Sequence, residues 1–261
     1  MNPQEIRNAA AILWQHWQQS TRLHELPAHC RPDSRAEAYA IQAELAKQSG
    51  QSIVGWKIAA TSKAGQQHIQ VDGPIAGCLL SARALEGGAR ISLAGNNMKV
   101  AEAEFAFRMG AALPKRATAY SVPEVLAAVA TLHPAIEVPD SRYADFTRVG
   151  APQLIADAAC ACWFALGPAT RIDWRAVDLA RHGVTGYRNG AVAGEGSGAN
   201  VLGDPRAALT WIANELCTYG EGLRAGEVVI TGTCLTPVPV AAGDGFRADF
   251  GAIGMLEAEF V

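Results

Sequence analysis

The sequence has no long apolar run and no excess of basic charge. Its 261 residues include 22 lysines and arginines against 25 aspartates and glutamates, a net charge of −3, and no basic cluster that could follow a phosphate backbone. No apolar stretch approaches the roughly 20 residues of a membrane-spanning helix, and the opening MNPQEIRNAA lacks the basic and apolar regions of a signal peptide. We therefore expect no nucleic-acid or membrane partner and a cytoplasmic location.

Cysteine pairs at metal-binding spacing are also absent. The six cysteines include no CxxC pair, and no histidine lies near them at zinc-finger spacing. Cys160 and Cys162, in DAACACWFAL, could chelate a soft metal, but two small side chains on one face of an apolar strand explain the pattern more simply. We expect reduced, buried thiols.

Apolar residues make up 49% of the chain, enough to bury a substantial core. Near the N-terminus, the apolar residues recur at the three- and four-residue spacing of a helix. This period predicts a helix from about Pro3 to Gln18. A second helix should begin after Asp33 or Ser34, either of which can cap it, and should stop at Gly50. Its predicted inward face consists of Ala36, Tyr39, Ala40, Ala43 and Leu45. Residues 1–51 are thus expected to form an N-terminal helical region.

Residues 52–261 change to short β-rich runs separated by glycine, proline and asparagine. Two stretches, VPEVLAAVATL and PRAALTWIANELCTYG, read as helices, and YRNGAVAGEG reads as a hairpin that turns at Asn189 and Gly190. Strands and helices do not alternate regularly, which argues against a doubly wound parallel sheet. We predict an α+β fold that is mainly β, with this region as the catalytic domain.

Three glutamates suggest a cation site. In KVAEAEFAFRM, Glu102 and Glu104 leave the same face of a predicted strand, and Glu137 lies in the apolar strand of HPAIEVPDSRY. An edge strand with a polar outer face would explain the first pair alone. A third acid in so apolar a strand favours a metal, because like charges that are withdrawn from water need a cation between them. Oxygen ligands of this kind suit Mg²⁺ or Mn²⁺.

The order of short motifs resembles the 2-oxopent-4-enoate hydratase and 4-oxalocrotonate decarboxylase branch of the fumarylacetoacetate hydrolase superfamily. The matching segments span nearly the whole chain: VGWKIAATSKAGQQHIQVDGPIAGCL, AEAEFAF, PAIEVPDSRY, NGAVAGEGSGANVLGDPRAALTWIANEL, and AGEVVITGT followed by PVPVAAGD. The resemblance implies a distorted mixed β roll or sandwich behind a helical N-terminal region. It also implies a cytoplasmic homo-oligomer, and Mg²⁺ or Mn²⁺ held by Glu102, Glu104 and Glu137.

The resemblance further implies a catalytic role for Lys57, which matches the lysine of the family's G-x-K-[IM]-G-x-T-S motif, although Ala59 replaces the motif's second glycine. An ammonium group can stabilise developing negative charge or transfer a proton. The alternative explanation is a lysine that reaches solvent from a sheet edge. Asp72, in VDGP, matches a family acid that could position a water or a proton, but it is equally an ordinary turn residue.

Two pairs of residues complete the predicted site. Thr61 and Ser62 would bind substrate or cap the short helix that follows them. Gly232 and Thr233 match positions where the family's hydroxyl and backbone N–H groups meet the substrate carboxylate, and a glycine permits close backbone approach. Asp140 and Arg142 follow Glu137 closely enough in sequence to orient it.

We interpret the chain as a hydratase that adds water to a 2-hydroxy-2,4-dienoate through its 2-oxo-3-enoate tautomer, giving a 4-hydroxy-2-oxo acid. The cation would act as Lewis acid and template, and Lys57 would support the enolate charge. Decarboxylation of 4-oxalocrotonate would use the same glutamates and remains an alternative. The two reactions should differ in whether the distal part of the pocket accepts a second carboxylate.

Two further alternatives are weaker. Acylpyruvate hydrolysis in the superfamily typically uses a glutamate and a histidine on a short lid helix, and here His68 lacks a neighbouring glutamate. A non-catalytic partner subunit of the same fold would have no need of the intact glutamates and Lys57. Such a subunit could associate with a related pathway enzyme.

Overall fold

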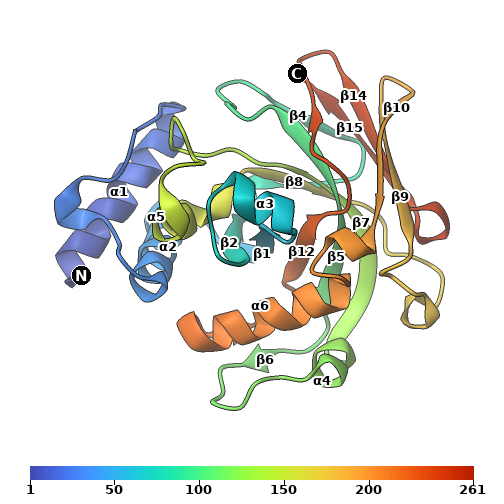
Figure 1. Cartoon of the computed structure of the whole chain (residues 1–261), viewed down its shortest axis with the longest axis horizontal. Coiled ribbons are helices and arrows are strands. Elements are labelled where there is room, and N and C mark those ends of the chain that lie inside the picture. Colours follow the sequence, from blue (N-terminus) through green and yellow to red (C-terminus); the bar gives the residue numbers. More distant parts are fainter.

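The computed structural model describes all residues 1–261 and contains two curved β-sheets, with most of the helices gathered at one end of the molecule and below the sheets (Figure 1). The helices are α1 (Pro3–Gln19), α2 (Arg35–Ser49), α3 (Lys63–His68), α4 (Val122–Ala127), α5 (Gly150–Ala156) and α6 (Pro205–Tyr219). None of them is both long enough and apolar enough to cross a membrane. The expected α+β architecture is confirmed.

The larger sheet has eight strands in the order β2-β1-β12-β5-β7-β8-β3, with β13 paired to β5. Its strands are β1 (Ile53–Ala59), β2 (Ile75–Leu80), β3 (Ala84–Glu86), β5 (Val100–Met109), β7 (Val129–Val138), β8 (Trp163–Leu166), β12 (Val228–Thr233) and β13 (Val238–Pro239). The pairs β1–β12 and β3–β8 are parallel and the other pairs are antiparallel. The sheet is therefore mixed, as expected, and not doubly wound.

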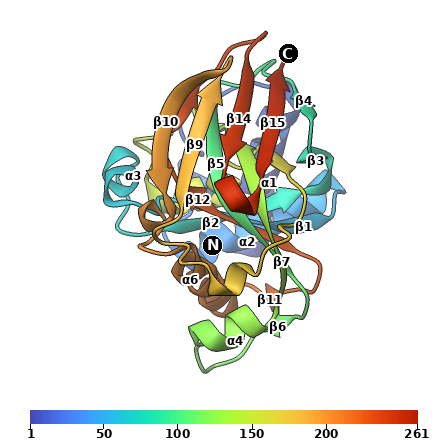
Figure 2. The same cartoon turned by 90° about the vertical axis from the view of Figure 1, so that its right-hand side faces the viewer.

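The second sheet has five strands in the order β10-β9-β14-β15-β4 (Figure 2). They are β4 (Ala89–Ile91), β9 (Gly183–Arg188), β10 (Ala191–Ser197), β14 (Gly245–Asp249) and β15 (Met255–Phe260); a separate small sheet joins β6 (Leu113–Pro114) to β11 (Gly222–Leu223). Phe105 of β5 packs edge-on against Phe250 after β14, with 5.0 Å between ring centres, so aromatic side chains join the two larger sheets.

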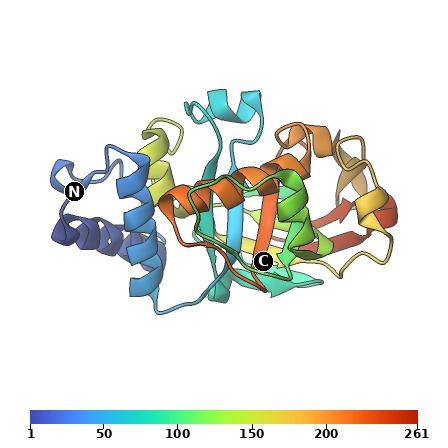
Figure 3. The same ribbon diagram turned by 90° about the horizontal axis from the view of Figure 1, so that it is seen from below.

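Helix α6 lies across the larger sheet (Figure 3). Pro205 occupies its first turn, as the sequence predicts, and the Asp204 side chain caps it. One apolar face of this helix is buried, namely Ala208, Leu209, Ile212, Ala213, Leu216 and Cys217.

The two N-terminal helices form where expected. A capping box between Asn2 and Glu5 starts α1, and Ser34 caps α2, which ends at Gly50. Both helices belong to the same continuous core as the sheets. The boundary between residues 51 and 52 remains a prediction.

The predicted inward face of α2 is partly wrong. Ala36 and Ala43 are exposed, whereas Gln42 is buried. The Gln42 amide donates to the carbonyls of Ala76 and Ile155 and accepts from the Cys78 N–H. A buried amide that satisfies backbone groups is polar, so a search for apolar periodicity overlooks it.

Two other local predictions need correction. VPEVLAAVATL is not one helix, because α4 ends at Ala127 and the chain continues into β7, where it pairs with β5. Cys160 and Cys162 precede β8, and Cys160 closes a turn that begins at Ala158. All six cysteines are buried and free, as expected. The hairpin is confirmed, with positive φ at Asn189 and Gly190.

A buried ion pair fixes the segment that follows β7. The Arg142 guanidinium contacts the Asp157 carboxylate, donates to the Ala161 carbonyl over 2.9 Å, and lies 4.0 Å from the ring centre of Trp17. Asp157 also accepts the Ser141 hydroxyl over 2.8 Å. Both charged side chains are almost completely buried, so each depends on the other for its charge compensation.

We expect Asp157→Ala to lower the free energy of unfolding by about 3–5 kcal/mol, because it leaves the Arg142 charge buried without its partner. Urea denaturation measures this loss. Glu259→Ala is the control, since it breaks an exposed pair with Arg90 and should cost less than about 1 kcal/mol. Equal effects of the two substitutions would contradict this role for the buried pair.

Candidate active site

The pairing of β5 with β7 brings the three glutamates together. Glu102 lies directly opposite Glu137 in the antiparallel register, and Glu104 lies two residues further along the same face of β5. One carboxylate oxygen from each residue falls within 4.8 Å of the other two. The sequence prediction of one three-carboxylate cluster agrees with this geometry.

These carboxylates lack the hydrogen bonds that buried oxygens normally accept. Glu104 and Glu137 are fully buried, while Glu102 is half-buried. The backbone N–H of Gly232 donates to Glu104 Oε2 over 2.7 Å, but Glu104 Oε1 and Glu137 Oε2 accept no hydrogen bond. Unsatisfied oxygens turned toward one another are the donor set that a hard divalent cation takes, so these residues fit Mg²⁺ or Mn²⁺.

Burial and mutual repulsion disfavour the ionised form of the cluster. Burial and the charge on Glu137 raise the pKa of Glu102 to about 7. The same two causes, together with Glu102, raise the pKa of Glu104 well above its ordinary value. Burial also raises the pKa of Glu137, against the opposing effect of Lys57. In the absence of a cation the cluster therefore tends to hold protons.

Lys57 is the cation that the protein itself supplies. Its Nζ lies 3.2 Å from Glu137 Oε1 and donates to the Ala159 carbonyl over 3.0 Å. Burial lowers the pKa of Lys57, but the carboxylates of Glu137, Glu102 and Glu104 outweigh burial, and the net pKa lies above the ordinary lysine value. When all four groups are ionised, two negative charges remain, which one divalent cation would neutralise.

A left-handed turn holds the acceptor of Lys57 in place. Ala158, Ala159 and Cys160 all have positive φ, of 50°, 48° and 63°. L-residues adopt this conformation at a cost, and such strain gathers at functional sites. The turn packs closely against β2 at Gly77, where an added Cβ atom would lie 1.8 Å from the Ala158 carbonyl oxygen. A glycine at position 77 is therefore required for the turn to reach Lys57.

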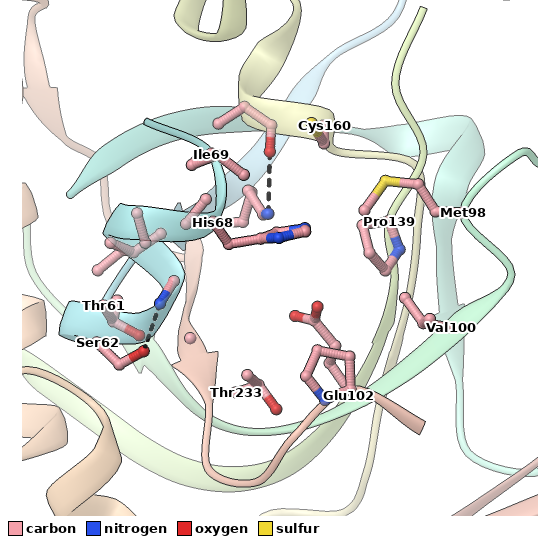
Figure 4. Close-up of a pocket in the computed structure, with 18 of the residues that line it drawn as sticks. Thr61, Ser62, His68, Ile69, Met98, Val100, Glu102, Pro139, Cys160 and Thr233 are labelled. Atoms are coloured by element: carbon pink, nitrogen blue, oxygen red, sulfur yellow. Dashed lines mark hydrogen bonds between the residues drawn. The ribbon is translucent and has the colours of Figure 1, made fainter. Parts of the chain in front are cut away.

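Glu102 and Lys57 line a cavity of about 750 Å³. Figure 4 shows the Glu102 side chain pointing into this cavity. Strands β1, β5 and β12, helix α3, the turn of Ala159 and Cys160, and several loops line it. Glu104 and Glu137 are fully buried next to Glu102 and do not line the cavity. A ligand that enters from solvent would reach the glutamate cluster through Glu102.

The cavity contains the four residues predicted to bind substrate, Thr61, Ser62, Gly232 and Thr233. Ser62 also caps α3, since its hydroxyl accepts the Gly65 N–H over 3.0 Å, so the capping role is confirmed. Gly232 has φ +106°, and a Cβ there would lie 2.3 Å from Thr61 Oγ1. This close approach lets the Gly232 N–H reach Glu104. Substrate binding by the four residues stays a prediction.

Three predicted residues lie elsewhere. Asp72 is 93% exposed, pairs with Arg35 over 3.7 Å, and does not line the cavity. Asp140 accepts hydrogen bonds from Arg22 and from the backbone N–H of Asn97. Neither Asp140 nor Arg142 makes the expected hydrogen bond to Glu137, because the chain leaves the sheet after Val138 and carries both side chains to other partners.

His68 also lines the cavity, a position that no sequence pattern predicted. Its imidazole points into the cavity in Figure 4 and meets the Phe146 ring edge-on, with 6.0 Å between ring centres. Ser62, Gly65 and His68 are spaced by three, which places them along one face of a short helix. That spacing is the signal that could have identified His68.

The sequence matches a known family over most of its length. The family model for the C-terminal domain of fumarylacetoacetate (FAA) hydrolase covers residues 54–261. The chain belongs to the fumarylacetoacetate hydrolase family. All three glutamates and Lys57 lie inside the matched range.

Relatives within this family carry two different activity names. A 2-keto-4-pentenoate hydratase of Paraburkholderia xenovorans is 33% identical, over 100% of this chain and 96% of the relative. A 4-oxalocrotonate decarboxylase of a Pseudomonas species is 30% identical over 100% of both chains. The solved 4-oxalocrotonate decarboxylase of Pseudomonas putida, complexed with magnesium and adipate, superposes with a TM-score of 0.90 at 28% identity, over 100% of this chain and 99% of that one.

We expect Gly77→Ala to lower the free energy of unfolding by about 1–3 kcal/mol, because the new methyl group must displace the turn at Ala158. Gly73→Ala is the matched control: no atom lies within 4 Å of its Cβ position, and it should change stability by less than about 0.5 kcal/mol. Chemical denaturation compares the two variants. A native-like Gly77→Ala protein would contradict the tight contact.

The raised carboxylate pKa values predict that protons compete with the cation. Glu102, with a pKa near 7, retains its proton at pH 6 and loses it by pH 8. Because the folded-state pKa exceeds the ordinary value of 4.5, the cation-free protein loses stability as pH rises through this window. Added Mg²⁺ should therefore raise the melting temperature more at pH 8 than at pH 6. An equal or larger rise at pH 6 would contradict this.

Proposed function

We propose that this protein is a divalent-cation-dependent hydratase, which adds water to a 2-hydroxy-2,4-dienoate to give a 4-hydroxy-2-oxo acid in the breakdown of aromatic compounds. The main support is the buried cluster of Glu102, Glu104 and Glu137 beside Lys57, at the floor of a cavity open to small molecules. The similarity to a named hydratase along the full chain is consistent with this reaction.

The three glutamates would hold Mg²⁺ or Mn²⁺, which would act as a Lewis acid toward the carboxylate and 2-oxo oxygens of the substrate. Buried oxygens without hydrogen-bond donors support this assignment. The solved relative complexed with magnesium supports the choice of a divalent cation, and Mg²⁺ against Mn²⁺ is part of the proposal.

Lys57 would stabilise the negative charge that develops on the substrate when its dienol becomes an enolate. Its two contacts, to Glu137 and to the Ala159 carbonyl, fix the ammonium at the cavity floor. A preorganised charge of this kind acts without reorganisation cost at the moment of reaction. Thr61, Ser62 and Thr233 line the same cavity, and their hydroxyl groups would orient the substrate carboxylate.

Decarboxylation of 4-oxalocrotonate is the second candidate, and the TM-score of 0.90 to a solved decarboxylase favours it. That substrate carries a second carboxylate. No arginine lines this cavity, and its only lysine is Lys57 at the floor. A distal carboxylate would meet no fixed positive charge, which favours the hydratase.

Acylpyruvate hydrolysis receives less support from the site. His68 faces the cavity, but α3, with the sequence KAGQQH, contains no acid that could pair with it. The nearest acid in sequence, Asp72, points to solvent and pairs with Arg35. Homo-oligomerisation and a cytoplasmic location remain predictions.

Glu104→Gln should weaken Mg²⁺ binding at least tenfold and abolish turnover together, since it replaces an anionic ligand with a neutral amide. Calorimetry and loss of dienol absorbance measure the two effects. Glu257→Gln, on the exposed face of β15, is the control and should match the native protein. Full turnover by native protein freed of metal would refute the proposed chemistry.

Separate assays with 2-hydroxypenta-2,4-dienoate, 4-oxalocrotonate and fumarylpyruvate, each with Mg²⁺, distinguish the candidate reactions. We expect a hydroxylated product from the first substrate. Release of CO₂ from the second as the dominant reaction would identify a decarboxylase. Pyruvate plus fumarate from the third would identify a hydrolase.

A further inference from the structure

The cavity has two chemically different sides. Thr61, Ser62 and Thr233 carry hydroxyl groups and lie on one side of Glu102 in Figure 4, while Val100 and its neighbours lie on the other. Met98, Val100 and Pro139 line the cavity on the side opposite Thr61 and Ser62, while Ile69 lies beside His68 (Figure 4). Phe146 is a further apolar lining residue. A ligand bound between these sides would meet hydroxyl groups at one end and hydrocarbon at the other.

Strand β5 sets the direction from the glutamates to the apolar side. Glu104, Glu102 and Val100 alternate onto the same face of the strand, with Glu104 deepest and Val100 half-buried. Met98 precedes the strand and also lines the cavity. A substrate whose acid end lies at Glu102 and Lys57 would thus extend its other end along Val100 and Met98.

Helix α3 and the loop after β7 provide the remaining apolar contacts. Ile69 follows α3 and lines the cavity, and the imidazole of His68 packs edge-on against Phe146. Both Ile69 and Phe146 are half-buried, so each offers apolar surface that a bound molecule would cover. Covering this surface would contribute hydrophobic binding energy.

Charge is confined to the floor of the cavity. Lys57 and Glu102 are the only lining residues with fixed charge, and both lie at the glutamate cluster. The remaining ionisable residues are His68 and Cys160, and burial raises the pKa of the Cys160 thiol to about 12, which keeps it neutral. A carboxylate beside Val100 and Met98 would lose hydration without gaining a lysine or arginine partner.

The cavity also exceeds the needs of a five-carbon acid. Its volume of about 750 Å³ lies within the range of roughly 300–1,000 Å³ that holds drug-sized ligands. A five-carbon dienoate at the glutamates would leave the Met98 and Phe146 side empty of substrate.

From these observations we propose that the site selects monocarboxylic 2-oxo-4-enoates whose far end carries an apolar group, an alkyl chain of several carbons or an aryl ring. Val100, Met98, Ile69 and Phe146 are the specificity-determining residues, and dicarboxylic acids bind more weakly than monocarboxylic ones. This inference rests on the proposed function for its substrate chemistry, but the selectivity itself is a property of binding.

Calorimetry with saturated 2-oxo acids and Mg²⁺ tests the selectivity without turnover. We expect 2-oxooctanoate to bind at least about tenfold more tightly than 2-oxopentanoate, because each added methylene enters an apolar site. 2-Oxohexanedioate should bind more weakly than 2-oxopentanoate. Equal binding of the two monoacids, tighter binding of the diacid, or no binding of any acid would overturn the inference.

A charge-introducing variant tests the location of the apolar side. Met98→Arg should lower the affinity for 2-oxooctanoate and raise that for 2-oxohexanedioate about tenfold, since the guanidinium can pair with the second carboxylate. Val192→Arg is the control, because Val192 is 58% exposed on β10 and does not line the cavity. An unchanged preference in Met98→Arg would contradict the assignment of this side.

Turnover assays separate this inference from the proposed function. Native protein with Mg²⁺ is given 2-hydroxydienoates with a hydrogen, a butyl or a phenyl group at the far carbon. Hydration that favours the butyl and phenyl compounds supports both proposals. Hydration with no such preference overturns the selectivity alone. Apolar-selective binding without hydration of any dienoate overturns the hydratase and supports the selectivity.

Discussion

Repulsion among three carboxylates inside a sheet is the constraint on which this structure depends. Glu102, Glu104 and Glu137 lie close together where β5 and β7 pair, and two of them are completely buried. Lys57 and the Gly232 N–H compensate part of this charge. The remaining imbalance matches one divalent cation, so a feature that would destabilise an ordinary sheet becomes a binding site.

The rigid and the variable parts of the site come from different elements. Paired strands supply the glutamates and Lys57, and a strained turn against Gly77 fixes the Lys57 acceptor. The walls that would meet the rest of a substrate come largely from α3 and from loops, such as the one that carries Phe146. Rigid strands can preserve one chemistry while loops change selectivity, which fits a family with both hydratase and decarboxylase names.

Sequence patterns correctly predicted the features that depend on strand alternation and on helix capping. The period of two in β5 placed Glu102 and Glu104 on one face, and Ser62 was recognised as a capping candidate. Sequence patterns could not reveal that Arg142 pairs with Asp157. Arg142 is close to Glu137 in sequence, but this closeness does not indicate where the chain turns after the strand ends. The left-handed turn at Ala159 was missed for a similar reason. Its residues are neither glycine nor asparagine, so only tertiary contacts impose the positive φ.

Anomalous diffraction from crystals soaked in Mn²⁺ would show whether one divalent cation joins the three glutamates. We expect a single strong peak within bonding distance of carboxylate oxygens from Glu102, Glu104 and Glu137, with Lys57 still beside Glu137. A structure at saturating Mn²⁺ with no peak there, and with the carboxylates turned apart or bridged by Lys57 alone, would contradict it.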